Sequence, residues 1–145
     1  MAEPKRVEVT LVGIRCINAD DGPGDELEIY GTLYVKIESV DPNGGLKSEI
    51  VMWSAPDDDP EDIAEGNLFR INNTQIVTLK EDEQLALGGH LVDYDWPDEN
   101  DDMDYEFVRV QYSEIEQDTR EHHVPFSDAG QRISVEYTVH ESPSS

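Results

Sequence analysis

An acidic segment over residues 93–104 holds the side chains best suited to chemistry. It reads Asp-Tyr-Asp-Trp-Pro-Asp-Glu-Asn-Asp-Asp-Met-Asp, so seven of its twelve residues are acidic. Side chains at i and i+2 of an extended strand point the same way, so Asp93 and Asp95 can face one ion. Asp101, with its neighbour Asp102, can return to that ion across a loop. Calcium takes about six to eight oxygen ligands from flexible loops of this kind. The spacing therefore predicts a calcium site.

A second acidic segment, residues 20–28, reads Asp-Asp-Gly-Pro-Gly-Asp-Glu-Leu-Glu. If it lies at the same end of the fold as residues 93–104, at least five carboxylates converge there. That number is enough for about one or two calcium ions, with backbone carbonyls and water completing the shells. The candidate ligands from this segment are Asp20, Asp21 and Asp25. The structural alternative is that each acidic run is simply a solvated surface.

The charge of the whole chain favours a role for cations. Its 145 residues include 34 acidic and 10 basic side chains, for a net charge of −24. Two like charges separated by about 4 Å repel by roughly 4 kcal/mol at an effective dielectric constant near 20. Converging carboxylates would therefore push their loops apart unless a cation binds between them. The same charge argues against nucleic acid as a partner, and against anionic membranes unless a cation bridges the two.

The elements that must position these carboxylates are predicted to be β-strands. From Leu27 to Val40, apolar and polar residues alternate with a period of two, which is typical of a strand with one buried face. Residues 7–17 alternate with a switch of phase that predicts a bulge near Gly13. Asp-Pro-Asn-Gly-Gly at 41–45 predicts a hairpin turn. The other expected strands are 48–53, 68–71, 75–79, 84–93, 105–112 and 131–140.

This pattern predicts an antiparallel β-sandwich of about eight strands in a single domain over residues 1–141, followed by a disordered tail at 142–145. One short helix is expected, because Asp59-Pro60 resembles an N-cap with a first-turn proline and Gly66 supplies a stop. Cys16 is the only cysteine of the chain, which excludes an intramolecular disulfide and a thiolate metal cage.

The sequence resembles the calcium-dependent lipid-binding C2 domain. Val-Thr-Leu-Val-Gly-Ile-Arg-Cys at 9–16, followed by an acidic loop and Tyr-Val-Lys-Ile at 34–37, is similar to the opening of that domain. Asp93, Asp95 and Asp101 match the Asp-x-Asp-x5-Asp pattern of its third calcium loop. The resemblance implies an eight-stranded antiparallel sandwich whose end loops bind calcium and then dock a phospholipid surface or a protein partner. A divergent C2-like domain of bacterial type is the better match.

The first loop departs from the family pattern, since Thr32 stands where the family places an aspartate and the acids come earlier. The chain also lacks the lysine-rich strand face that some members use for inositol lipids, which favours calcium binding itself or a protein partner. Trp96 is a candidate membrane tip, although a tryptophan at such a position more often packs its ring across the base of the loop. An EF-hand is disfavoured, because Asp98 stands at the position of the essential glycine.

Other classes of function are weighed against calcium binding. A calcium-independent acidic interaction protein, such as an immunity protein or a nucleic-acid mimic, is the main alternative. An accessory domain of a pore-forming or secreted machine is a third possibility. Catalysis is not expected, because the sequence contains no nucleophile elbow, phosphate loop or zinc signature. The N-terminus shows no signal peptide, so a cytoplasmic location is the default. The sequence does not indicate an oligomeric state.

Overall fold

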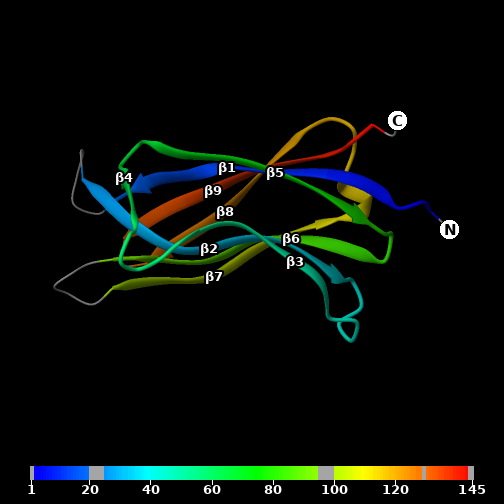
Figure 1. Ribbon diagram of the computed structural model, residues 1–145, viewed down its shortest axis with the longest axis horizontal. Helices are drawn as coiled ribbons and strands as arrows, with labels where there is room; N and C mark the ends of the chain where they lie inside the picture. The colour runs from blue at the N-terminus through cyan, green and yellow to red at the C-terminus, as the bar shows by residue number, and fades with distance from the viewer. Residues whose placement is uncertain (1, 20–24, 95–99, 129, 144–145) are drawn as a thin grey trace.

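The protein is a sandwich of two antiparallel sheets (Figure 1). The computed structural model describes residues 2–19, 25–94, 100–128 and 130–143. Within these ranges the strands are β1 (Lys5–Asn18), β2 (Glu26–Ser39), β3 (Leu46–Ala55), β4 (Glu61–Ala64), β5 (Leu68–Leu79), β6 (Glu83–Asp93), β7 (Asp101–Gln111), β8 (Arg120–Asp128) and β9 (Gln131–Glu141), with a single 3-10 turn, η1 (Tyr112–Glu114). The prediction of an antiparallel β-sandwich is confirmed.

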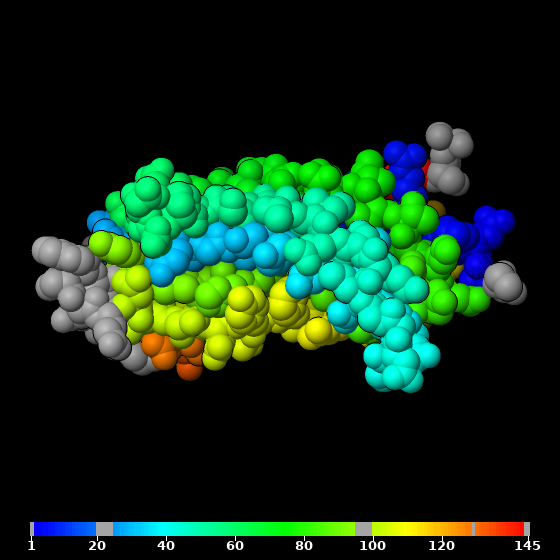
Figure 2. Space-filling model, turned by 60° about the horizontal axis from the view of Figure 1, so that its bottom comes forward, coloured from blue at the N-terminus to red at the C-terminus, as the bar shows by residue number. Residues whose placement is uncertain are grey.

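The two sheets have the strand orders β5-β1-β9-β8 and β3-β2-β6-β7, and β4 also pairs with β2. β3 and β4 share one edge of β2, because β3 pairs with residues 31–38 and β4 with residues 26–29. The chain then crosses from β4 in one sheet to β5 in the other. The hairpin turn at residues 40–45 projects from the body of the sandwich, as Figures 1 and 2 show.

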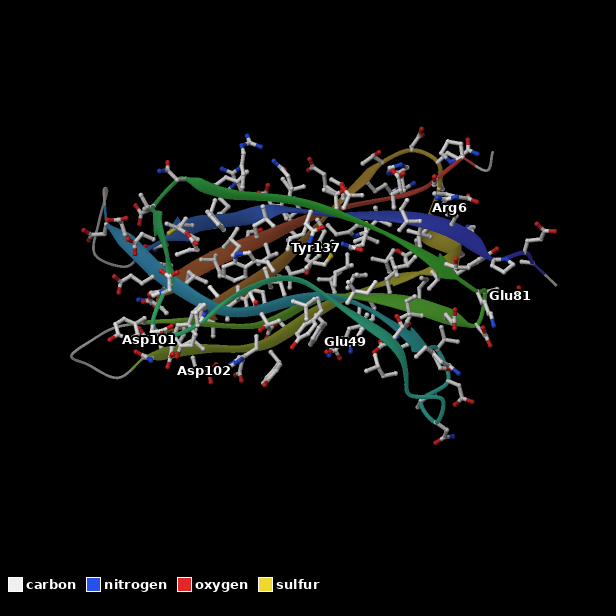
Figure 3. The ribbon with its side chains drawn as sticks, in the orientation of Figure 1. Arg6, Glu49, Glu81, Asp101, Asp102 and Tyr137 are labelled. Atoms are coloured by element: carbon white, nitrogen blue, oxygen red, sulfur yellow. The ribbon has the colours of Figure 1, made fainter. Side chains whose placement is uncertain are left out.

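The core lies between the sheets and follows the alternation in the sequence. Leu27, Ile29, Leu33 and Val35 of β2 are all buried, as their period of two predicts. Tyr137 of β9 is fully buried in the middle of the sandwich (Figure 3), where its hydroxyl donates to the backbone oxygen of Tyr34 at 2.7 Å. Because a buried hydroxyl without a partner is costly, this hydrogen bond lets a tyrosine occupy the core.

The predicted bulge and turn are confirmed. The pairing of β1 shifts register between Leu11 and Gly13 against both of its neighbours. A Cβ atom at Gly13 would lie 2.2 Å from the backbone oxygen of Phe69, so the close approach of β5 requires glycine there. At the β2–β3 turn, Gly44 N donates to Asp41 O at 2.8 Å, which closes the hairpin.

The predicted short helix is wrong. Residues 61–64 form strand β4, which pairs with β2 from Glu26↔Ala64 to Ile29↔Glu61. The start of β2 has a free edge because β3 pairs with β2 only from Gly31 onward. A segment of four residues gains little from helical hydrogen bonds. Pairing with β2 satisfies its backbone and also buries Ile63, which is 2% exposed.

The strand count also differs from the prediction. Residues 68–71 and 75–79 belong to one strand, β5, which continues through Asn72 with a positive φ of 53°. Strand β8 was not among the predicted strands. The charged residues and the proline of this segment obscure the strand alternation of its two buried residues, Val124 and Phe126.

The chain ends at the side of the sandwich opposite the starts of β2 and β7 (Figure 1). Ser142, in the tail predicted to be disordered, donates its backbone N–H to Arg6 O at 2.7 Å. Within the described ranges, no helix is long and apolar enough to cross a bilayer.

Candidate functional site

The described parts of the two acidic segments, residues 25–28 and the positions around Asp93, meet at one end of the sandwich, as predicted. The register of β2 and β6 places Ile29 opposite Asp93, and Tyr94 N donates to Glu28 O at 2.7 Å. Asp101 and Asp102 lie at this end in Figure 3, far from Arg6 and Glu81. We call it the acidic end, where β1 and β6 finish and β2, β7 and β9 begin. The opposite end holds the 40–45 and 80–82 turns.

Asp93 lies buried at the acidic end and is hydrogen-bonded to both sheets. It is the one charged residue buried among the described positions, with 5% of its surface exposed. Its Oδ1 accepts a hydrogen bond from Glu28 N at 2.8 Å, and its Oδ2 accepts one from Gln131 Nε2 at 2.9 Å. Glu28 lies in the same sheet as Asp93, whereas Gln131 begins β9 in the other sheet. The Asp93 carboxylate therefore links the two sheets.

Gln131 has one polar atom without a partner. Its Oε1 is buried and accepts no hydrogen bond, the single such side-chain atom among the described residues. A carboxylate can only accept, so the hydrogen bond to Asp93 requires Nε2 on that side and turns Oε1 away from it. A buried acceptor left unsatisfied costs about 1–3 kcal/mol. This cost marks the position as one where a donor or a cation would add stability.

Glu65 brings the first acidic segment and the β4–β5 connection together. Its Oε1 accepts from Ala19 N at 2.9 Å, and its backbone N–H donates to Asp25 O at 2.9 Å. Close by, Cys16 is fully buried. Burial, followed by the negative charges of Glu65 and Asp93, raises the pKa of the Cys16 thiol to about 11. Burial is the main cause of this shift, and the two carboxylates add to it.

Asp101 and Asp102 face opposite sides of the second sheet. Asp101 is paired across the strands with Asp93, whereas Asp102 is paired with Val92. Because directly opposite residues of an antiparallel pair share a face, Asp101 and Asp93 lie on the same side. Asp25 also lies at this end, beside Glu65. The strand register thus brings Asp93 and Asp101 together and sets Asp102 apart, whereas Asp25 shares only the same end of the sandwich.

The Asp102 carboxylate is held on the outer face of the sheet. Its Oδ1 lies 2.8 Å from His90 Nε2 and accepts from Asp104 N at 2.8 Å. The Asp104 N–H, and then His90, lowers the pKa of Asp102 below its ordinary value. Tyr105, which is 66% exposed, stacks on His90 with a centroid distance of 4.3 Å. These contacts give Asp102 a local structural role.

Four of the predicted site residues, Asp20, Asp21, Asp95 and Trp96, lie outside the described residues. Within the described ranges, no three acidic, cysteine or histidine side chains are already grouped as a metal site. What the structure shows at this end is the buried Asp93 carboxylate and the groups that donate hydrogen bonds to it.

Basic residues are distributed unevenly between the two ends. By their positions along the strands, seven of the ten lie toward the opposite end. Those seven are Lys5, Arg6, Lys36, Lys47, Lys80, Arg109 and Arg120, and the others are Arg15, Arg70 and Arg132. Arg15 is paired with Glu136 at 2.8 Å, and Arg132 lines a hollow on the outer face of the first sheet. The acidic end therefore has few positive charges.

Structural comparison places this arrangement of strands among known folds. The C2 domain A of plant extended synaptotagmin 1 matches with a TM-score of 0.50 and 10% identity, over 100% of this chain and 99% of that one. The fold is C2-like. Human GIVD cytosolic phospholipase A2 matches with a TM-score of 0.49 and 13% identity, over 97% of the C2-like chain but 17% of the phospholipase.

The same human phospholipase, in complex with a methyl gamma-linolenyl fluorophosphonate inhibitor and terbium chloride, matches with a TM-score of 0.48 and 12% identity, over 97% of this chain and 18% of that one. No protein-family model and no curated protein matches the sequence. At these low identities the likeness concerns the fold of the C2-like domain alone.

Sequence reasoning missed Glu65, His90 and Gln131 at this end of the C2-like domain. Glu65 lies in the segment that was predicted to be a helix, and His90 lies within the predicted strand 84–93, where nothing in the sequence links it to Asp102. Gln131 is a neutral residue outside both acidic segments, so the density of acidic residues could not reveal it. Its only signal is its position, directly after Gly130 at the start of an alternating strand.

Proposed function

We propose that the acidic end binds calcium and that the loaded end docks a phospholipid surface or a protein partner. Asp93 and Asp101 are the proposed ligands within the described residues, and Asp25 is a further candidate at the same end of the sandwich. Asp20, Asp21 and Asp95 are proposed from the sequence pattern. A bound calcium ion would supply positive charge to oxygen ligands and cancel the repulsion between the two acidic segments.

A single observation carries this proposal. Asp93, the first residue of the Asp-x-Asp-x5-Asp pattern, is buried where the two acidic segments join, and it accepts from the backbone of one of them. Two hydrogen bonds at 2.8 and 2.9 Å fix its carboxylate. A ligand held in this way is pre-organised, so cation binding does not have to pay for ordering it.

Calorimetry of chelator-stripped protein tests the proposal. We expect calcium to bind with a dissociation constant between about 1 μM and 1 mM. Magnesium should bind more weakly, because its octahedral demand does not suit a flexible set of carboxylates. We also expect calcium to raise the melting temperature. If no heat is released and the melting temperature is the same with calcium and with chelator, the proposal is wrong.

Matched variants locate the site. Asp93→Asn combined with Asp101→Asn removes two negative charges from the acidic end and should abolish the calcium response. Asp82→Asn combined with Asp118→Asn removes the same charge from exposed positions at the opposite end. This control should keep the response of the original protein. Equal losses in both double variants would instead indicate nonspecific counter-ion binding.

The uneven charge also favours a second candidate, an acidic interaction protein that binds a basic partner without calcium. Binding of this kind weakens steeply with salt, because exposed charges are screened beyond about 8–10 Å at physiological ionic strength. Titration with poly-lysine at low and high salt, in the presence of chelator, distinguishes the two candidates. Binding that requires calcium supports the first candidate, and binding that ignores chelator supports the second.

A further inference from the structure

The β8–β9 connection brings a neutral side chain to the acidic end from the other sheet. Gln131 follows this connection, and its Nε2 donates to Asp93 Oδ2 at 2.9 Å. Asp93 belongs to β6 in the sheet β3-β2-β6-β7, and Gln131 belongs to β9 in the sheet β5-β1-β9-β8. Neither acidic segment contains Gln131, so its contribution is independent of the calcium-loop pattern.

We propose that Gln131 is part of the cation site, where Nε2 positions the Asp93 carboxylate and Oε1 supplies an oxygen ligand from the opposite sheet. This inference rests on the proposed calcium binding. The supporting observation is that Oε1 is buried and has no hydrogen-bond partner among the described residues. An amide oxygen is a ligand that calcium accepts alongside carboxylates.

The neighbouring donors among the described residues do not satisfy Gln131 Oε1. Side chains alternate along a strand, so Arg132, the next residue, points to the outer face of its sheet. There it lines a surface hollow with Ile17 and Pro125. Ala19 N, another donor at the acidic end, is taken by Glu65 Oε1 at 2.9 Å. The amide orientation of Gln131 is set by Asp93, which as a carboxylate can only accept.

A cation held by Asp93 and Gln131 together would bridge the two sheets. Calcium binding should therefore slow the local separation of β9 from β6. Local opening of this kind is measured by amide hydrogen exchange. We expect calcium to increase the protection of amides in residues 131–135 as well as those around Asp93.

Gln131→Met tests the inference, because methionine has nearly the same shape but neither the donor nor the oxygen. We expect calcium affinity to fall at least tenfold, the range seen when the partner of a metal ligand is removed. The calcium-dependent protection of residues 131–135 should disappear. Gln131→Glu should lower the melting temperature in chelator by repelling Asp93, and should increase the rise that calcium produces above that of the original protein.

Gln84→Met is the matched control. Gln84 Nε2 also donates to a carboxylate, Glu38 Oε1, at 2.7 Å, but at the opposite end. This control should leave calcium affinity unchanged. If the original protein binds calcium and Gln131→Met binds it equally well, Gln131 has only a structural role and the inference is wrong. If the original protein binds no calcium, the proposed function itself is wrong. Should Gln131→Met fail to fold, the Gln131→Glu variant decides by the direction of its calcium response.

Discussion

A glutamine donates to a carboxylate at each end of the sandwich, and the two pairs differ in their surroundings. At the opposite end, Arg109 Nε also donates to Glu38 Oε1 at 2.9 Å, and Gln111 Nε2 donates to Gln84 Oε1 at 2.6 Å. The side-chain oxygen of Gln84 therefore has a hydrogen-bond donor within the protein. At the acidic end, Gln131 Oε1 has no donor among the described residues.

Lys5 shows a second difference between the two ends, because a basic side chain satisfies several oxygen atoms at the opposite end. Its Nζ donates to Tyr112 O and Ile115 O, both at 2.9 Å, and lies 4.2 Å from the centroid of the Tyr112 ring. A protein ammonium group thus occupies a cluster of oxygen atoms at the opposite end. Among the described residues, basic side chains thus satisfy oxygen atoms at the opposite end, whereas the acidic end, where the proposed calcium site lies, has few basic residues.

The largest expected effect breaks the internal cation site. Lys5→Met leaves two backbone oxygens without their charged donor, so we expect the free energy of unfolding to fall by about 2–3 kcal/mol. The loss should be the same in calcium and in chelator, because it occurs at the end that supplies its own cation. Urea denaturation in both conditions measures it. A loss that calcium restores would contradict the comparison, and Lys47→Met at an exposed position serves as the control.

The next effect is a pH dependence that reports on the acidic end. Burial, then Glu65 and Asp93, raises the pKa of Cys16 to about 11, above its value of 9.0 in the unfolded chain. The folded protein keeps the thiol proton over this interval while the unfolded chain loses it. The stabilisation is therefore complete below pH 9 and is lost as the pH rises toward 11. We expect a loss of about 1–2 kcal/mol, measured as the difference in unfolding free energy between the original protein and Cys16→Ala.

Calcium should weaken this pH dependence. Positive charge beside Glu65 and Asp93 offsets the negative charge that helps to hold the thiol proton, so the pKa of Cys16 should move down toward its ordinary value and closer to that of the unfolded chain. Thiolate absorbance in calcium and in chelator measures the change, with Cys16→Ala as the blank. An identical titration in both conditions would place any bound calcium away from Asp93.

A smaller effect is expected when the acidic end is given its own cation. Gln131→Lys places an ammonium group beside Asp93, as Lys5 does at the opposite end. We expect the unfolding free energy in chelator to rise by about 1 kcal/mol and the response to calcium to shrink. Thermal unfolding with and without calcium measures both. A variant that is less stable in chelator and still responds fully to calcium would contradict the comparison.

The smallest effect is at the Glu38 pair. The hydrogen bond from Arg109 is the main cause that lowers the pKa of Glu38, and Gln84 adds to it, while burial acts in the opposite direction. Arg109 is about half exposed, so Arg109→Met should cost only about 0.5 kcal/mol at neutral pH. A lowered pKa stabilises the fold above the unfolded value, so this difference should vanish as the pH falls below about 4.3. Denaturation at pH 7 and pH 3 measures it.

The fold could be predicted where burial follows a simple period. The alternation over residues 27–40 and the phase switch at Gly13 correspond to β2 and to the bulge in β1. The Asp59-Pro60 segment was misassigned, because its charges and proline suit a helix start while the free edge of β2 is invisible in the sequence. Strand β8 was missed for a related reason, since its apolar residues are only two and are separated by a proline.

The acidic residues and their spacing, by themselves, determined that negative charge gathers in two separate segments, because side-chain type and order are local properties. Tertiary structure alone decided that Asp93 turns inward between the sheets, that Asp102 turns outward to His90, and that a glutamine from β9 meets Asp93. These placements depend on strand register and on how two sheets pack. They arise from contacts between residues that lie 12, 38 and 65 positions apart in the sequence, which no local pattern encodes.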